Sequence, residues 1–535
     1  MNGAHLLVDC LNQQGVTTIF GMPGGQTVSI YDALLKFPGI RHVLARNEHA
    51  GAFMADGYSR ATGRPGVCLV TAGPGITNCV TGLGNAYSDS IPFLLISGQI
   101  KRSAIGKSRG YFHEMDNLGV TAPLTKWNAS ARSADEIPGL VQRAFHEMAS
   151  GRPRPVHLDL PIDVSAEETS ARPLPGTQGK TPVPDTAEIE RAAALLRSAQ
   201  RPLIIAGGGV ASANACEELL SLARSVQAPV FMTPMGKGAI SDDDPLAEGM
   251  LFQRLTSDLT KMKDNFSPLP AMADVVLAVG CRFSQVATGN WELPIPENLI
   301  QIDIDEDELG RNYPARVGIC GDAKVALAEI NEALDTQPHS GTVLWNARSP
   351  IPDGQRWQIK GFDLVPVMRR LLDRDAIVSC DVTRLYYMML ANFQTYQPRS
   401  FLQSSCFISL GTGFPGAIGA KAAYPDRQVV AIAGDGGFMM TSQELACAVQ
   451  EKLNVVSIVI NDSCLSAMKG IQNRSYGGRH TAVDLINPDF AKYAESFGAL
   501  GLRVDEFSQF EPALREALDA GRPAVIDVRA PQTAE

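Results

Sequence analysis

Short apolar runs alternate with helix-like segments along this chain. The clearest pair is Gln428 to Ala433 (QVVAIA) and Val455 to Ile460 (VVSIVI), which have the pattern of buried strands with a helical segment between them. A strand–helix–strand unit with parallel strands crosses over right-handed, and it sets the carboxyl ends of both strands at one edge of the sheet. The pattern therefore predicts an α/β fold built on parallel sheets flanked by helices.

Glycine and acidic residues follow these two strands. The first strand is closed by Gly434, Asp435, Gly436 and Gly437, and the second by Asn461 and Asp462. We expect Asp435 and Asp462 to share the sheet edge, where two close carboxylates need a proton or a cation between them. Oxygen-rich sites with few protein ligands suit magnesium completed by phosphate oxygens, and the glycines let backbone N–H groups approach a diphosphate.

The segment after the glycines has its own helix signal. Thr441-Ser442-Gln443-Glu444 has the spacing of a capping box, and apolar residues follow at helical period. We expect a helix that starts near Thr441 and aims its positive end at the same edge. Each motif has an alternative explanation when taken alone, because short motifs often match by chance. Gly434-Asp435-Gly436 can be an ordinary tight turn, and Asp462 can be a loop aspartate without a metal.

A second group of candidate site residues lies near the start of the chain, at two further junctions between a strand and a helix. A strand VLAR leads to Glu48, which opens a helix, and a strand VCLVTAG leads to Gly73-Pro74-Gly75 before another helix. Ligands of open parallel sheets bind outside the carboxyl edge, so Glu48 is placed for chemistry. The alternative is that Glu48 only favours the helix dipole from the first turn.

These segments resemble the thiamine diphosphate-dependent enzymes, in particular the acetolactate synthases and their relatives. The resemblance rests on RNEHAGAFMADGYSRATGRPGV, TAGPGITN, ISGQ and the glycine–aspartate motif, and it extends over essentially the whole chain. It implies that Glu48 hydrogen-bonds the aminopyrimidine ring of the cofactor. It also implies that Mg²⁺ is held by Asp435, Asp462 and the backbone carbonyl of Cys464. Asp462 is a departure, since most relatives have two asparagines where this chain has Asn461-Asp462.

The resemblance implies further site residues. Leu410, in the segment SLGTGFPGAIG, matches the large aliphatic residue that supports the bent cofactor; a core leucine in a glycine-rich turn is the alternative. The remaining cofactor contacts that it implies are Pro74, Asn78 and Met468. The residues that it places in the reaction chamber are Gln99, Phe112 and His113. His113 replaces the usual glutamine, and it can guide a substrate carboxylate, move a proton or simply bind a loop carbonyl.

A chain of 535 residues is too long to fold around one hydrophobic core, and this length suggests about three domains. Two stretches, Ser165–Asp185 and Gln337–Asp353, have the composition of linkers. We expect a pyrimidine-binding domain at 1–165, a central domain at 186–336 and a diphosphate-binding domain at 354–535. The central segment has strands of its own, PLIIAGG, APVFMT, DVVLAVG and LIQIDID, which predict a further parallel sheet.

FAD is a doubtful cofactor on sequence grounds. Gly207-Gly208-Gly209 lacks the full dinucleotide spacing, so tight packing of a strand on a helix explains it better. Biosynthetic acetolactate synthases bind FAD across the central domain, and Gly280-Cys281-Arg282-Phe283 resembles part of their pattern. The segment FQRLTSDLTKMKD, however, lacks their histidine–glycine turn.

Composition limits the partners and the location. The net charge of −10 comes from mixed acids and bases, which predicts no basic face for nucleic acid. Apolar runs are too short to span a bilayer, and Met1 is not followed by an export signal. Ten cysteines without CxxC spacing predict reduced thiols in a cytoplasmic protein.

The resemblance implies an enzyme that cleaves a 2-oxo acid and transfers the retained unit, with condensation of pyruvate to acetolactate as the leading expectation. It also implies a homodimer or a dimer of dimers, with the cofactor between domains of two subunits. Ile471 replaces a tryptophan of the biosynthetic relatives, and Ile162 replaces a lysine that follows DLP. The alternatives are therefore a non-ligating decarboxylase, an acetyltransferase of the sulfoacetaldehyde acetyltransferase kind, and a catalytically silent regulatory paralogue.

Overall fold

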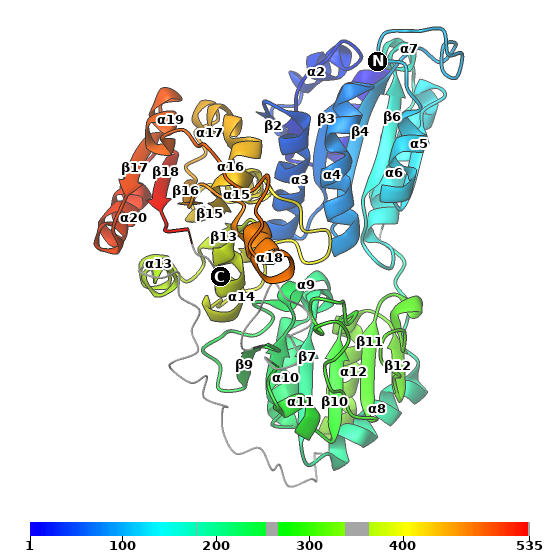
Figure 1. Ribbon diagram of the computed structural model, residues 1–535. Helices are drawn as coiled ribbons and strands as arrows, with labels where there is room; N and C mark the ends of the chain where they lie inside the picture. Colours follow the sequence, from blue (N-terminus) through cyan, green and yellow to red (C-terminus); the bar gives the residue numbers. More distant parts are fainter. Residues whose placement is uncertain (178, 253–265, 337–362, 533–535) are drawn as a thin grey trace.

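The computed structural model describes residues 1–177, 179–252, 266–336 and 363–532 (Figure 1). The predicted linker Gln337–Asp353, and all but the first residue of the segment FQRLTSDLTKMKD, lie outside these residues. The described part of the chain forms three six-stranded sheets, in which every strand pairs with its neighbours in parallel. The predicted α/β class with three parallel sheets is confirmed.

The first sheet has the order β2-β1-β3-β4-β6-β5. Its strands are β1 (Thr18–Gly21), β2 (Arg41–Leu44), β3 (Gly66–Val70), β4 (Phe93–Gln99), β5 (Trp127–Ser130) and β6 (Val156–Pro161). The helices around it are α1 (Gly3–Gln13), α2 (Val28–Leu34), α3 (Glu48–Thr62), α4 (Pro74–Asp89), α5 (Asn117–Thr121), α6 (Ile137–Ala149) and α7 (Ile162–Ala166). As predicted, Glu48 opens a helix. The second predicted helix is also present, but it begins at Pro74, within Gly73-Pro74-Gly75 rather than after it.

The central sheet has the order β12-β11-β10-β7-β8-β9, the order of a doubly wound dinucleotide-binding sheet. Its strands are β7 (Pro202–Ala206), β8 (Val230–Met232), β9 (Ala247–Met250), β10 (Val275–Val279), β11 (Leu299–Asp303) and β12 (Val317–Cys320). Its helices are α8 (Thr186–Ser198), α9 (Gly208–Ser212), α10 (Cys216–Ser225), α11 (Leu269–Met272) and α12 (Ala323–Thr336). The four strands predicted for this segment are all present.

The third sheet repeats the topology of the first, with the order β14-β13-β15-β16-β18-β17. Its strands are β13 (Ile377–Cys380), β14 (Phe401–Leu402), β15 (Val429–Gly434), β16 (Val456–Asn461), β17 (Leu500–Val504) and β18 (Ala524–Arg529). Its helices are α13 (Leu364–Leu371), α14 (Arg384–Asn392), α15 (Gly413–Ala423), α16 (Asp435–Thr441), α17 (Leu445–Gln450), α18 (Ser466–Tyr476), α19 (Phe490–Ser496) and α20 (Phe510–Asp519).

The predicted helix start near Thr441 is wrong. Helix α16 begins at Asp435, and Thr441 is its last residue, followed by a short 3₁₀ turn and then α17. The side chains of the expected capping box have other partners: the Thr441 hydroxyl donates to the Gly411 carbonyl, and the Glu444 carboxylate accepts the Arg46 N–H. Contacts distant in sequence therefore override the local capping signal.

The first and third domains stand side by side above the central domain (Figure 1), and helices α3 and α15 join them. The two helices touch through their backbones, because a Cβ at Gly57 would lie 2.5 Å from the Gly416 Cα atom. Apolar residues of both domains share one buried cluster around this crossing, including Met54, Ala417 and Ala420. The two domains therefore form a continuous core.

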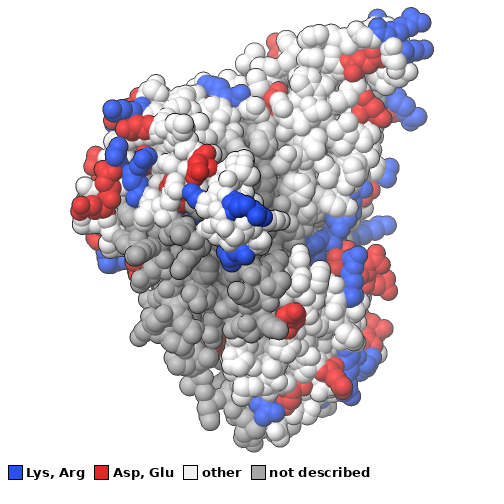
Figure 2. Space-filling model, viewed as in Figure 1, with Lys and Arg blue, Asp and Glu red and all other residues white. Residues whose placement is uncertain are grey.

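Acidic and basic side chains are interspersed over the face shown in Figure 2. In the described part of the chain, no helix has the length and apolar character needed to cross a membrane. All ten cysteines are unpaired, and seven of them are buried.

Candidate active site

The two predicted metal-binding carboxylates meet at one edge of the third sheet. Strands β15 and β16 are parallel neighbours, with Gly434 opposite Ile460, so Asp435 and Asp462 follow adjacent strand ends. Both side chains are buried. Burial and the nearby negative charge of Asp462 raise the pKa of Asp435 above its ordinary value. The predicted shared edge is confirmed.

Asn487 links the residues at this edge, and no pattern in the sequence marks it as a site residue. Its Nδ2 group donates to Asp435 Oδ2 at 2.6 Å and to Asn461 Oδ1 at 3.1 Å. The other oxygen of Asp435 accepts the Gly436 N–H at 2.8 Å. Asn461 points inward and donates to Asp527 Oδ1 at 2.9 Å. Asn461 is thus linked to Asp435 through Asn487 and to Asp527 directly, while Asp462 supplies the negative charge that acts on Asp435.

Asp462 has partners of its own. Arg384, the first residue of α14, places Nη1 3.4 Å from Asp462 Oδ2, and the Ser466 hydroxyl donates to the same oxygen. Neither contact involves Asp462 Oδ1. One carboxylate oxygen is thus held by the protein.

These residues fit Mg²⁺ together with a diphosphate. The described residues contain no cluster of three or more His, Cys, Asp or Glu side chains that suits a metal. Magnesium is commonly held by one or two carboxylates plus phosphate oxygens, and a dication relieves the repulsion that raises the pKa of Asp435. Gly437, close to Asp435, has no room for a side chain, since a Cβ there would lie 2.7 Å from Oδ2 of Asp381, a buried acid that follows β13.

Asp381 holds the turn that carries Leu410. It follows β13 and is fully buried, and its carboxylate accepts the N–H groups of Gly411 at 2.8 Å and Val382 at 2.7 Å. Burial raises the pKa of Asp381 to about 7. Gly411 has a φ of +84°, which favours glycine there. Leu410 itself is half-buried at the same edge, and its role as a support for the cofactor stays a prediction.

Glu48 lies at the first turn of α3, where Asn47 caps the helix by accepting the His49 N–H. Glu48 Oε2 accepts a hydrogen bond of 2.9 Å from Asn78 Nδ2 on α4. The structure thus brings together two of the predicted cofactor contacts. Glu444 of the third domain braces the preceding segment by accepting the Arg46 N–H at 3.0 Å, and burial raises the pKa of Glu444 to about 7.

Phe112 and His113 lie on a loop beside the start of α4. Their rings stack with centroids 3.8 Å apart, and Phe112 is 75% exposed. His113 has a φ of +64°, and its Nδ1 is buried without a hydrogen-bond partner among the described residues. A Cβ at Gly73 would lie 3.2 Å from His113 Cβ, so the histidine packs on the turn that precedes Pro74.

Gln99 and Met468 lie in different surroundings. Gln99 ends β4 as expected, but its side chain is buried, with Nε2 donating to Asp159 Oδ2 at 3.0 Å and Oε1 accepting the Ile100 N–H at 2.8 Å. Met468 is 49% exposed on α18. The role of Gln99 in the reaction chamber and that of Met468 as a cofactor contact stay predictions.

A cavity of about 280 Å³ lies where the three domains meet. Gly208 and Gly209, from the segment that resembles a dinucleotide turn, line it together with Gly280–Phe283 and the cationic residues Arg60, Arg152, Lys237 and Arg399. The close packing expected of these glycines is present, because a Cβ at Gly209 would lie 2.5 Å from the Gly280 Cα atom, and the choice between packing and a dinucleotide turn stays a prediction. The fold of the central sheet does not by itself assign a ligand to this cavity.

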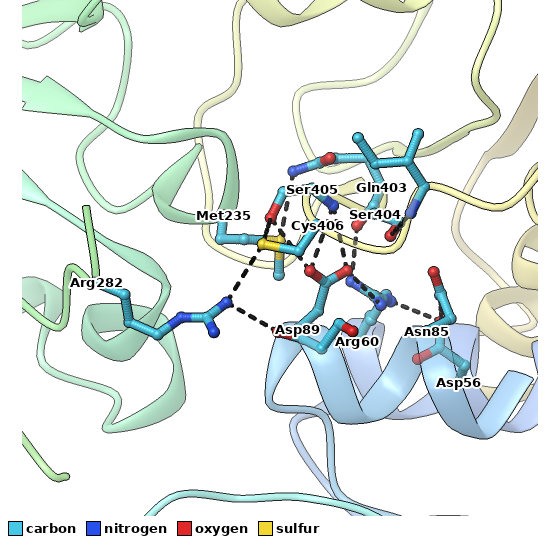
Figure 3. Close-up of polar contacts among 12 residues, drawn as sticks. Asp56, Arg60, Asn85, Asp89, Met235, Arg282, Gln403, Ser404, Ser405 and Cys406 are labelled. Carbon is cyan, nitrogen blue, oxygen red and sulfur yellow. Dashed lines mark hydrogen bonds and ion pairs between the residues drawn. The ribbon is translucent and has the colours of Figure 1, made fainter. Parts of the chain in front are cut away.

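A buried ion network borders the cavity and links α3, α4 and the third domain (Figure 3). Arg60 donates to Asp56 at 2.7 Å, to Asp89 at 3.0 Å and to the Gln403 carbonyl at 2.7 Å. The Ser405 N–H and hydroxyl donate to Asp89. Arg60 and Asp89 sit on the helices that carry Glu48 and Asn78, so the network fixes the far ends of both.

Comparison with known proteins gives full-length matches. Residues 1–120 match the family described as "Thiamine pyrophosphate enzyme, N-terminal TPP binding domain", residues 189–330 match its central domain, and residues 381–528 match its C-terminal TPP binding domain. The probable acetolactate synthase large subunit of Methanocaldococcus jannaschii is 39% identical over 99% of this chain and 92% of its own length.

Two further relatives have the same description. The acetolactate synthase large subunit of Parasynechococcus marenigrum is 38% identical over 99% of this chain and 87% of its own length. The acetolactate synthase isozyme 3 large subunit of Escherichia coli is 34% identical over 98% of this chain and 93% of its own length. The chain therefore belongs to the thiamine diphosphate-dependent enzymes, and within them it is similar to the acetolactate synthase large subunits.

Proposed function

We propose that this enzyme uses thiamine diphosphate and Mg²⁺ to cleave a 2-oxo acid and condense the retained unit with a second carbonyl compound, with pyruvate as donor and acetolactate as product. The observation that carries the proposal is the pairing of Glu48 with Asn78 at one sheet edge and of Asp435 with Asp462 at another, in a chain similar over its length to acetolactate synthases. When bound, thiamine diphosphate supplies the carbanion chemistry.

The chain's own residues divide the remaining work. Asp435, Asp462 and the Cys464 carbonyl would hold Mg²⁺, and Gly434, Gly436 and Gly437 would admit the diphosphate. Leu410 would support the cofactor from below. Glu48 would hydrogen-bond the pyrimidine ring and manage a proton there, while the Asn78 amide keeps Glu48 Oε2 in place.

The reaction chamber would lie beside the loop that carries Phe112 and His113. The exposed Phe112 ring can shield the reacting atoms from water, and the unpartnered His113 Nδ1 can meet a polar group of the substrate. Pro74 and Met468 would contact the cofactor. Gln99 would act there only if its bond to Asp159 opened.

The proposal extends to assembly and location. Exposed apolar side chains such as Phe112, Met439 and Met440 support a homodimer or dimer of dimers. The unpaired cysteines support a cytoplasmic protein. We propose the domain limits 1–165, 186–336 and 354–535. The end of α7 at Ala166 and the start of α8 at Thr186 support the first boundary, and residue 354 lies outside the described residues.

The test is a screen of 2-oxo acids for carbon dioxide release, with and without thiamine diphosphate and Mg²⁺, followed by product analysis with pyruvate. Acetolactate supports the proposal. Acetaldehyde would identify a decarboxylase, acetyl phosphate an acetyltransferase, and a protein that binds the cofactor without turnover would be a regulatory paralogue. Any of these three results would overturn it.

A mutation tests the role of Glu48 directly. Glu48→Gln should leave the fold intact and slow hydrogen–deuterium exchange at C2 of the bound cofactor by roughly 10²-fold or more, because the proton transfer loses its acid. Glu188→Gln is the matched control, since Glu188 also lies in the first turn of a helix, α8. Unchanged exchange in Glu48→Gln would refute the role, and an equal effect of both variants would indicate helix electrostatics instead.

A further inference from the structure

The acid at position 462 raises a question of charge balance at the proposed metal site. An aspartate in place of the amide that most relatives have there adds one negative charge next to Asp435 and to the place where a diphosphate would lie. The negative charges of Asp435, Asp462 and a bound diphosphate repel one another. Burial of the two aspartates strengthens this repulsion because little water screens it. A cation within the protein must therefore offset Asp462 if the site is to bind an anionic cofactor well.

The structure supplies that cation from the start of α14, which follows β13, two strands away from β16 in the sheet. In the third sheet β13, β15 and β16 are adjacent, and they lead to Arg384, Asp435 and Asp462 respectively. Arg384 Nη1 lies 3.4 Å from Asp462 Oδ2, and the two side chains are 22% and 5% exposed. Among the described residues this is the ion pair that Asp462 makes. Lys469, which also follows β16, pairs instead with Asp484 at 2.8 Å.

The geometry assigns each part of Asp462 a separate task. Arg384 and Ser466 both bind Oδ2, so that oxygen is held away from a metal ion. Oδ1 takes part in neither contact and is available to a cation. The start of α14 is itself packed on the glycine motif, because a Cβ at Gly434 would lie 3.3 Å from Thr383 Oγ1. Arg384 is therefore fixed beside the motif by its own backbone.

We propose that Arg384 is a positioning residue of the cofactor site: its charge compensates Asp462, turns Oδ1 toward the metal and keeps the site receptive to a diphosphate. The inference rests on the proposed Mg²⁺–diphosphate site. The positive charge of Arg384 and the negative charge of Asp462 cancel, so the pair adds no net charge, as an uncharged asparagine at position 462 would. It follows that the two residues depend on each other, and that replacing both restores a balanced site.

A double-mutant cycle tests this dependence by binding rather than by turnover. The proteins are the wild type, Arg384→Gln, Asp462→Asn and the double variant, each stripped of cofactor and titrated calorimetrically with thiamine diphosphate at fixed Mg²⁺. Arg384→Gln should weaken binding by about 10- to 100-fold, the usual effect of losing a partner of a metal ligand. The double variant should return to within a few-fold of the wild type. Arg370→Gln, which breaks an exposed ion pair with Glu511, should leave binding unchanged.

Several results would overturn the proposal. If Arg384→Gln weakens binding equally in the wild type and in the Asp462→Asn background, the two residues are not coupled. Unchanged binding in Arg384→Gln would also exclude compensation. If Arg384→Gln fails to fold, as judged by thermal unfolding, Arg384→Lys carries the test: it keeps the charge and should bind within a few-fold of the wild type. Failure of the wild type itself to bind the cofactor would refute the proposed function, which is a distinct outcome.

Discussion

Replacing Gly57 by alanine should destabilise the protein, although alanine normally favours a helix. Gly57 lies inside α3 at the crossing with α15, and a Cβ there would lie 2.5 Å from Gly416 Cα and closer still to the Gly416 carbonyl. Contacts of Cβ below 3.0 Å essentially never occur, and the Gly416 carbonyl oxygen would lie at 2.3 Å, so the helix backbones would have to separate by about 0.7 Å.

The loss of stability expected for Gly57→Ala is the difference between two opposed effects. Overpacking against a rigid backbone costs up to about 3 kcal/mol, and a gap of this size also weakens the dispersion contacts along the crossing. The higher helix propensity of alanine returns about 1 kcal/mol. The net loss is about 2 kcal/mol, which corresponds to a fall in Tm of roughly 3 °C, because the first and third domains share one core and unfold as a unit of more than about 300 residues.

Two other glycines serve as controls in the same thermal unfolding assay. Gly416→Ala places its Cβ 2.8 Å from the hydroxyl oxygen of Ser379, which can rotate away, so it should be milder. Gly139→Ala lies on α6 with nothing within 4 Å and should be neutral or stabilising. A Gly57→Ala protein as stable as Gly139→Ala would refute the claim that the two backbones are in contact.

Two further predictions concern buried charges. The Glu444 pKa is raised from 4.5 to about 7 by burial, so the folded state binds the extra proton, and stability falls by up to about 3 kcal/mol as the pH rises from 4.5 through 7. Glu444→Gln should flatten that part of the stability–pH curve, measured by denaturant unfolding; an unchanged slope would exclude Glu444 as its source. Arg60→Ala should cost about 3–5 kcal/mol because it leaves Asp56 and Asp89 buried without their cation, whereas Arg132→Ala, in an exposed pair with Glu136, should change Tm little. Equal shifts in the two arginine variants would contradict the burial argument.

The sequence predicted the parts of the site that depend on strand ends. Asp435, Asp462 and Glu48 each follow a short apolar run, and parallel pairing alone sets such residues at sheet edges. The same rule gave the α/β class and the strands of the central sheet. These features follow from local pattern and from the handedness of crossovers, so they could be predicted without coordinates.

Residues that act through distant contacts could not be predicted in this way. Asn487 lies in a loop without periodicity, and only the folded chain shows that it bridges Asp435 and Asn461. Asp381 had a usable signal, since it follows a strand at the same edge. The false helix start at Thr441 arose because a capping box is a local rule, while Glu444 is held by Arg46, which is distant in sequence.

The position of Glu48 is determined largely by the third domain. Its helix, α3, is braced at the start by Glu444, touches Gly416 in the middle, and is bound near the end through Arg60 to Gln403. A fragment ending at residue 336 would lack all three contacts and would leave Arg60 and two aspartates in a partly exposed cluster. The first domain therefore cannot hold its proposed catalytic acid in place without the diphosphate-binding domain, and changes at the interface between them should alter activity even where they touch no substrate.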